Sequence, residues 1–147
     1  MRNLYGFNNI KSVLLYTNII FIITIILILR YKKNIKNNRI KNYVSLLLLF
    51  IMSIISCKYH DCQCYSNKKN IILKWQKVDI LVSLIITFYF FILYFKNINL
   101  YILLLSGFSI VLWAAPPLNN NNNLYVLCHS LWHILIGVIC YLLIIND

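Results

Sequence analysis

The sequence predicts an all-α fold: a polytopic integral membrane helix bundle of about five transmembrane helices, forming a single domain over residues 1–147. Its residues are 61% hydrophobic, whereas soluble domains are usually about 45–50% apolar. The apolar residues lie in continuous runs rather than in alternation with polar residues, which favours helices over barrel strands. Only helices and closed barrels satisfy the hydrogen bonds of their own backbone in lipid. A bundle of membrane-spanning helices is therefore the expected fold.

Five apolar runs reach or approach the roughly 17–25 residues that a transmembrane helix needs. We expect the first run to be retained as a helix, because it is longer than the roughly 7–15 residues of a signal-peptide core and no small-residue cleavage motif follows it. The segment "IILKWQKVD" precedes the third run and can extend that helix, which would bury Asp79. The predicted spans are Ser12–Leu29, Tyr43–Tyr59, Val78–Phe95, Asn97–Ala114 and Leu124–Ile145.

The formal net charge of +11 comes from basic residues that lie almost entirely between the apolar runs, as in "RYKKNIKNNRIK". Short basic loops beside membrane spans are the usual pattern, and anionic lipid headgroups are their natural partner. Because no basic stripe marks a soluble module, we expect membrane lipids and no nucleic acid as partners. Lysine and arginine are divided equally between the two sides of the membrane. Only the dense loop Arg30–Lys41 favours the side on which it lies, opposite to the N-terminus, as cytosolic.

The polar residues of the spans fall in one layer of the membrane, on the side that holds the N-terminus. Ser56 and His60 lie at the end of the second span, and Asp79 lies near the start of the third. His129 and His133 lie in the first half of the fifth span. Successive spans alternate in direction, so these positions share one side. Ionisable groups inside a membrane are costly, and by default they indicate a functional site.

The spacing of these residues suits a metal site. Ser56 and His60 are four residues apart, as are His129 and His133, so the members of each pair share one helix face. Three imidazoles leave the fourth position of a tetrahedral zinc site open, as in catalytic zinc sites. Asp79 could orient the bound water and take its proton. Each residue also has an ordinary structural role, since a histidine can bond to a neighbour, a serine to its own helix and an aspartate can cap a helix. Their co-location favours the metal site.

The motifs "S-x-x-x-H" at Ser56–His60, "DILVS" from Asp79 and "HSLWH" at His129–His133 resemble the CREST superfamily of membrane hydrolases, which includes the alkaline ceramidases. The "HSLWH" string and the cysteine-containing insert are most similar to the transmembrane-8/myomaker branch. The resemblance implies that His60, His129 and His133 bind Zn²⁺, and that Asp79 and Ser56 support the zinc-bound water and the oxyanion. That family has seven spans, so the chain is reduced or truncated relative to it.

The cysteines leave a rival interpretation open. A disulfide could join the "CQC" segment to Cys128 if that side of the membrane is lumenal. A second kind of metal site would combine His60 with Cys62 and Cys64. Because C-x-C is not the C-x₂₋₄-C spacing of zinc sites, thiols or disulfides are favoured over a cysteine-bound metal.

The sequence as a whole predicts a zinc-dependent membrane hydrolase that cleaves an amide or ester bond in a lipid. The alternative is a non-enzymatic membrane scaffold, fusion or receptor-like protein, in which a structural metal or a hydrogen-bonded histidine cluster joins helices. Either protein would be a multi-pass component of the endomembrane system or the plasma membrane. The substrate, if there is one, is a membrane lipid.

Overall fold

The computed structural model describes residues 11–32, 39–66, 68–119 and 122–147, and these form helices and no strand. The predicted all-α fold is therefore confirmed. Much of the basic loop Arg30–Lys41 lies outside the described residues. The helices are α1 (Lys11–Thr17), α2 (Ile19–Lys32), α3 (Arg39–Tyr65), α4 (Lys69–Leu93), the short 3₁₀ helix η1 (Phe95–Asn97), α5 (Leu100–Asn119) and α6 (Asn122–Ile145).

Four segments of the described chain are long and apolar enough to cross a membrane: Val13–Tyr31, Ile40–Cys64, Lys69–Leu93 and Asn123–Ile145. The fifth predicted span, Asn97–Ala114, corresponds to α5, and its apolar stretch is the shorter Leu100–Ala114. At a rise of 1.5 Å per residue this stretch falls short of the roughly 30 Å hydrocarbon core. The expected five spans are thus four long ones and one short one.

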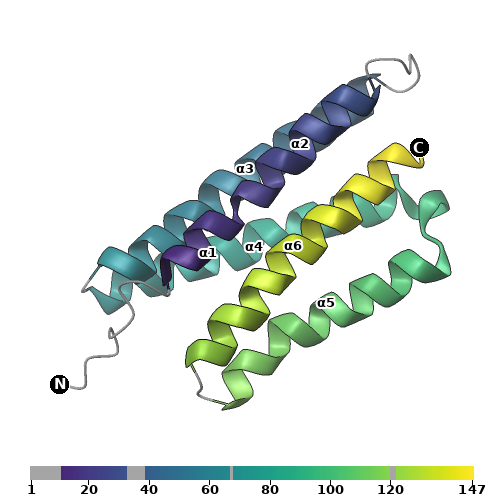
Figure 1. Ribbon diagram of the computed structural model, residues 1–147. Coiled ribbons are helices and arrows are strands. Elements are labelled where there is room, and N and C mark those ends of the chain that lie inside the picture. The colour runs from purple at the N-terminus through teal and green to yellow at the C-terminus, as the bar shows by residue number, and fades with distance from the viewer. Residues whose placement is uncertain (1–10, 33–38, 67, 120–121) are drawn as a thin grey trace.

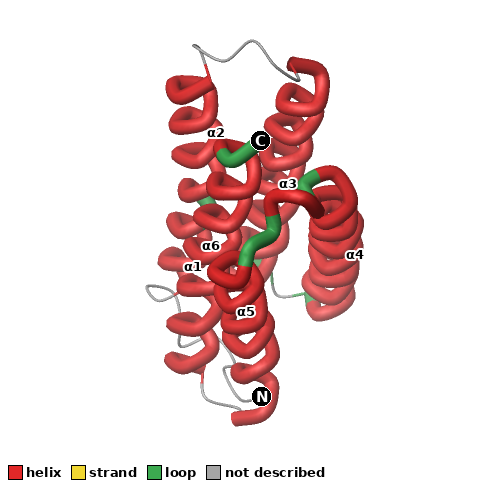
Figure 2. Tube along the Cα trace, turned by 90° about the vertical axis from the view of Figure 1, so that its right-hand side faces the viewer, coloured by secondary structure: helices red, strands yellow, loops and turns green. Residues whose placement is uncertain are grey.

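The helices α1 and α2 lie alongside α3 in Figure 1, and in Figure 2 they lie on the opposite side of the bundle from α4. They pack against both α3 and α6, while α4 packs against α3 and α5 packs against α6. The His60 ring on α3 also meets the His129 and His133 rings on α6. The helices α1 and α2 therefore flank the two helices that carry the histidines.

The first predicted span is interrupted at Asn18, which separates α1 from α2. The side-chain amide of Asn18 donates a hydrogen bond to the Leu14 carbonyl at 3.0 Å, and so does the hydroxyl of Thr17, also at 3.0 Å. Side chains that bond locally to the backbone compete with the regular helical pattern and bend helices. The predicted first span is confirmed as Val13–Tyr31, with a one-residue turn at Asn18 inside it.

The third predicted span corresponds to α4, which begins at Lys69 and not at the predicted Val78. The segment "IILKWQKVD" therefore does extend this helix. Asp79 consequently lies ten residues inside α4, or about 15 Å along its axis, and its side chain is buried. A helix N-cap role for this aspartate is excluded, because the cap position of α4 is Lys68.

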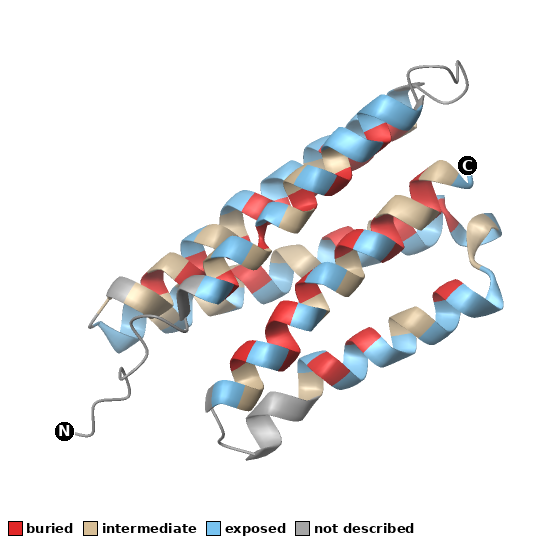
Figure 3. Ribbon diagram, viewed as in Figure 1, coloured by how far each residue is buried: buried red, intermediate tan, exposed pale blue. Residues whose placement is uncertain are grey.

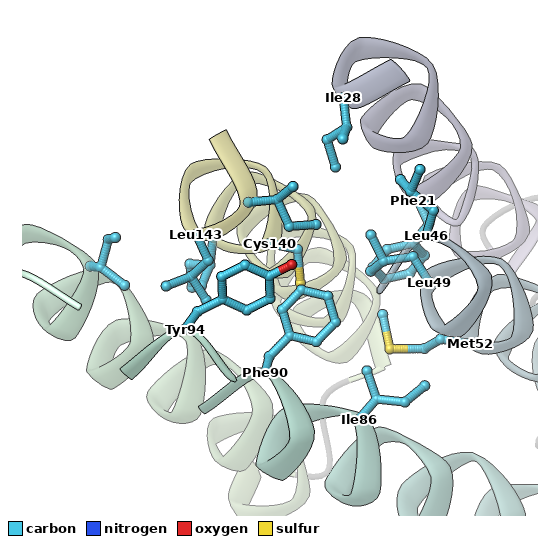
Figure 4. Close-up of a cluster of buried hydrophobic side chains, with 13 residues drawn as sticks. Phe21, Ile28, Leu46, Leu49, Met52, Ile86, Phe90, Tyr94, Cys140 and Leu143 are labelled. Carbon is cyan, nitrogen blue, oxygen red and sulfur yellow. The ribbon is translucent and has the colours of Figure 1, made fainter. Parts of the chain in front are cut away.

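A cluster of buried apolar side chains fills the half of the bundle near the C-terminal end of α6. In Figure 4, Phe90 and Tyr94 lie beside Cys140 and Leu143, with Met52 of α3 opposite. The three histidines, Ser56 and Asp79 do not belong to this cluster. The cluster comprises Phe21, Ile28, Leu46, Leu49, Met52, Ile86, Phe90, Tyr94, Ile102, Ile139, Cys140, Leu143 and Ile144.

The outward faces of the bundle are apolar. Figure 3 shows exposed residues along the outer surfaces of the helices and buried residues facing inward. On α5, for example, Leu103, Leu104 and Phe108 are exposed. Apolar surface of this extent is disfavoured in water but suits contact with lipid chains.

Gly137 of α6 packs tightly against α2. A Cβ atom there would lie 2.9 Å from Ile20 Cγ1 and 3.1 Å from Thr24 Oγ1. The Thr24 hydroxyl also donates a hydrogen bond to the Gly137 carbonyl across the interface, at 3.3 Å. Close approach of helix backbones at a small residue is a common way for membrane helices to associate.

We therefore expect Gly137→Ala to separate α2 from α6 and to destabilise the protein by about 1–3 kcal/mol, the usual cost of overpacking. Thermal unfolding in detergent, followed by circular dichroism, measures the effect. Gly107→Ala is the matched control, because a Cβ atom at Gly107 meets nothing within 4 Å. Equal melting temperatures for the two variants would contradict a tight α2–α6 contact.

Candidate metal centre

Three histidines from two helices converge inside the bundle. His60 of α3 and His129 and His133 of α6 each offer a ring nitrogen, and these atoms all lie within 4.8 Å of one another. The ring centroids are 5.0 Å apart for His60 and His129, 5.2 Å for His60 and His133, and 4.7 Å for His129 and His133. All three side chains are buried. This group could hold a metal ion.

The separation of the nitrogens suits a first-row transition metal. Three atoms no farther apart than 4.8 Å all lie within about 2.8 Å of one common point. Zinc–nitrogen bonds measure about 2.0–2.1 Å, so small side-chain movements of under about 1 Å would complete the coordination. Imidazole ligands suit zinc, copper, iron and nickel, so the geometry by itself selects a class of metals rather than one.

Two of the inward nitrogens have no hydrogen-bond partner. Nε2 of His60 and Nε2 of His129 are buried and unpaired in this structure. A buried polar atom without a partner costs several kcal/mol in a membrane. A metal ion would satisfy both atoms, so the donor set fits such an ion.

Ser56 links Asp79 to the histidines. The Ser56 hydroxyl lies 3.4 Å from Nε2 of His133 and is hydrogen-bonded to the Asp79 carboxylate. Both Ser56 and Asp79 are buried. Asp61, the other aspartate on this side, instead forms an exposed ion pair with Lys58 at 3.1 Å. The structure thus brings together all five residues that the sequence analysis singled out, with Asp79 reaching the histidines through Ser56.

Residues that the sequence analysis missed surround the outer nitrogens of two histidines. Nδ1 of His60 lies 2.8 Å from Oε1 of Gln63, whose amide nitrogen donates to the hydroxyls of Tyr59 at 2.6 Å and Tyr125 at 3.3 Å. Gln63 is three residues after His60 on α3, so helical spacing could have identified it. Nδ1 of His133 lies 2.9 Å from the Thr17 hydroxyl. No local signal could have identified Thr17, because it is 116 residues away in the chain.

Aromatic rings enclose the group. Tyr125 stacks on His129 with centroids 5.2 Å apart, and Trp132 lies 5.1 Å from the same ring. Phe21, a member of the apolar core, meets His133 edge-on at 5.8 Å. These contacts restrict the ring orientations and the access of water.

Cys62 and Cys64 do not join His60 in a metal-binding group. Among the described residues, the group with metal-binding geometry contains only the three histidines. Cys62 and Cys64 lie within α3, which continues to Tyr65, rather than in a loop between spans. The described cysteines form no disulfide.

No protein-family model, no curated protein and no solved structure matches the chain at a significant level. Assignment to a family is therefore not made.

Proposed function

We propose that the protein is a zinc-dependent membrane hydrolase that cleaves an amide or ester bond in a lipid. The observation that carries the proposal is the convergence of three buried imidazoles, two of them with an unpaired Nε2, inside helices long enough to cross a membrane. The motif resemblance to the CREST superfamily supports it. The same resemblance is the reason to place the protein in the endomembrane system or the plasma membrane.

His60, His129 and His133 would hold the metal. A zinc ion bound by three histidines keeps one position open and lowers the pKa of a water molecule there to about 7, which supplies a nucleophile at neutral pH. Three neutral ligands leave the charge of the ion uncompensated, which strengthens this effect.

Asp79 and Ser56 would take part in the transfer of a proton from the attacking water. The Ser56 hydroxyl stands between the carboxylate of Asp79 and the histidine group. A carboxylate in this position can accept a proton from the attacking water and return it to the leaving group, as a general acid–base. While its hydrogen is donated to the carboxylate, the Ser56 hydroxyl can accept from the water and orient it. Once Asp79 has taken up the proton, the Ser56 hydroxyl can donate to the oxyanion that develops on the substrate carbonyl.

The depth of the site supports a lipid substrate. His133 lies eleven residues after the start of α6, or about 16 Å along the helix. His133 is therefore near the middle of the span Asn123–Ile145, deep in the roughly 30 Å hydrocarbon core. An apolar substrate reaches this depth more readily than a water-soluble one, and its acyl chains can lie beside the exposed apolar faces of the helices.

We expect detergent-purified wild-type protein to carry about one zinc ion per chain. Removal of the metal with a chelator should abolish the release of fatty acid from a mixture of ceramides and glycerolipids, and added Zn²⁺ should restore it. Elemental analysis and mass spectrometry of the products measure the two quantities. Folded protein that carries zinc but releases no lipid product would favour the scaffold alternative, in which the metal only joins α3 to α6. Folded protein without metal would refute the zinc site.

A further inference from the structure

The hydrogen bonds around the histidines determine which ring nitrogen carries the proton. A neutral imidazole has one nitrogen that donates and one that accepts, and the bond made by one nitrogen sets the state of the other. The contacts of His60 and His133 are specific enough to assign this state from the chemistry of their partners.

For His60 the partner is an amide oxygen. Oε1 of Gln63 can only accept a hydrogen bond, so Nδ1 of His60, 2.8 Å away, must be the donor. On the other side of Gln63, its amide nitrogen donates to the hydroxyls of Tyr59 and Tyr125. Nε2 of His60 then carries a lone pair, and this is the buried atom without a partner.

For His133 the partner is a hydroxyl that has already used its hydrogen. Thr17 donates to the Leu14 carbonyl at 3.0 Å, so it accepts from Nδ1 of His133 at 2.9 Å. The contact of Nε2 with Ser56 is longer, at 3.4 Å, beyond the usual range for a hydrogen bond from a ring nitrogen. Nε2 of His133 is therefore also left as a lone pair that faces the other two rings.

We infer that Gln63 and Thr17 are positioning residues that hold His60 and His133 in the Nδ1–H form, so that both rings present Nε2 to a common metal ion. The metal part of this inference rests on the proposed function, whereas the protonation state does not. Ligating histidines in other proteins usually donate their second nitrogen to a fixed acceptor, and loss of that acceptor typically weakens metal binding about 10–100-fold. In this protein one acceptor comes from the same helix as its histidine and the other comes from α1.

The chain contains only three histidines, which makes a direct measurement practical. The full chain is labelled with ¹⁵N-histidine, stripped of metal with a chelator and studied by NMR in detergent micelles. We expect His60 and His133 to show a protonated Nδ1 and an unprotonated Nε2. Gln63→Leu should alter this pattern at His60, and Thr17→Val should alter it at His133.

Conservative variants separate positioning from general damage. Gln63→Glu and Thr17→Ser keep an acceptor oxygen, so they should keep the wild-type pattern and the wild-type affinity for Zn²⁺. Gln63→Leu and Thr17→Val should bind Zn²⁺ about 10–100-fold more weakly while they retain helical content.

The inference is overturned if Nε2 of His60 or of His133 is protonated in the metal-free wild type. It is equally overturned if Gln63→Leu and Thr17→Val leave both the ring protonation and the affinity for Zn²⁺ unchanged. If the wild type binds no zinc but shows the Nδ1–H forms, the proposed function fails while the assignment of protons stands. If the wild type binds zinc but its metal-free form carries a proton on Nε2 of His60 or of His133, the assignment of protons fails while the proposed zinc site stands.

Discussion

His133→Ala is expected to reduce bound zinc from about one ion per chain to nearly none. His133 is fully buried, and its ring lies close to both of the other histidines. Its loss removes one of three ligands and leaves Nε2 of His60 and Nε2 of His129 facing a cavity. Two imidazoles alone bind zinc far more weakly than three, because the site then lacks the ligand set of catalytic zinc sites. Elemental analysis of detergent-purified protein gives the metal content directly.

The matched control for this variant is Ser130→Ala. Ser130 is buried on the same helix, three residues before His133, and its hydroxyl has no hydrogen-bond partner. Loss of that hydroxyl should therefore change neither the fold nor the zinc content. Zinc near one equivalent in His133→Ala would show that the ion binds elsewhere.

Asp79→Asn is expected to abolish turnover while zinc stays bound. The substitution preserves the size of the side chain but removes its capacity to accept a proton, and general acid–base catalysis typically contributes about 10²–10⁴-fold to a rate. The three histidines are unchanged, so the metal content should remain near that of the wild type. The two measurements are the release of fatty acid from the lipid mixture and elemental analysis.

Asp61→Asn serves as the comparison for Asp79→Asn. Asp61 belongs to an exposed ion pair with Lys58, and exposed pairs contribute little to stability. This variant should hydrolyse lipid at the wild-type rate. Wild-type activity in Asp79→Asn would show that the carboxylate has no part in the reaction, and loss of zinc in that variant would assign Asp79 to metal retention instead.

Much of the candidate site follows from one-dimensional patterns. The two i, i+4 pairs place Ser56 with His60 and His129 with His133, because helix geometry holds such residues on one face. Alternation of the spans places Asp79 on the same side of the membrane. These arguments need only the position of a residue along its own helix, so they succeed without knowledge of which helices are neighbours.

The hydrogen-bond partners of Nδ1 of His60 and Nδ1 of His133 could not be predicted from such patterns alone. Helical spacing from His60 could have identified Gln63, but the contact of Gln63 with the hydroxyl of Tyr125 depends on the packing of α6 against α3. Thr17 reaches His133 only because α1 packs against α6. The turn at Asn18 and the short apolar stretch of α5 likewise differ from the predicted spans.

The sequence by itself determined that the protein is a bundle of membrane helices and that its histidines, Ser56 and Asp79 share one layer. It could do so because hydropathy and helical spacing are local properties of the chain. Only the tertiary structure decided that the three imidazoles meet, that Ser56 connects them to Asp79 and that Gln63 and Thr17 hold two of the rings. The physical reason is that helix neighbours are chosen by the fit of side chains between helices, such as the close approach at Gly137, and no local pattern encodes that fit.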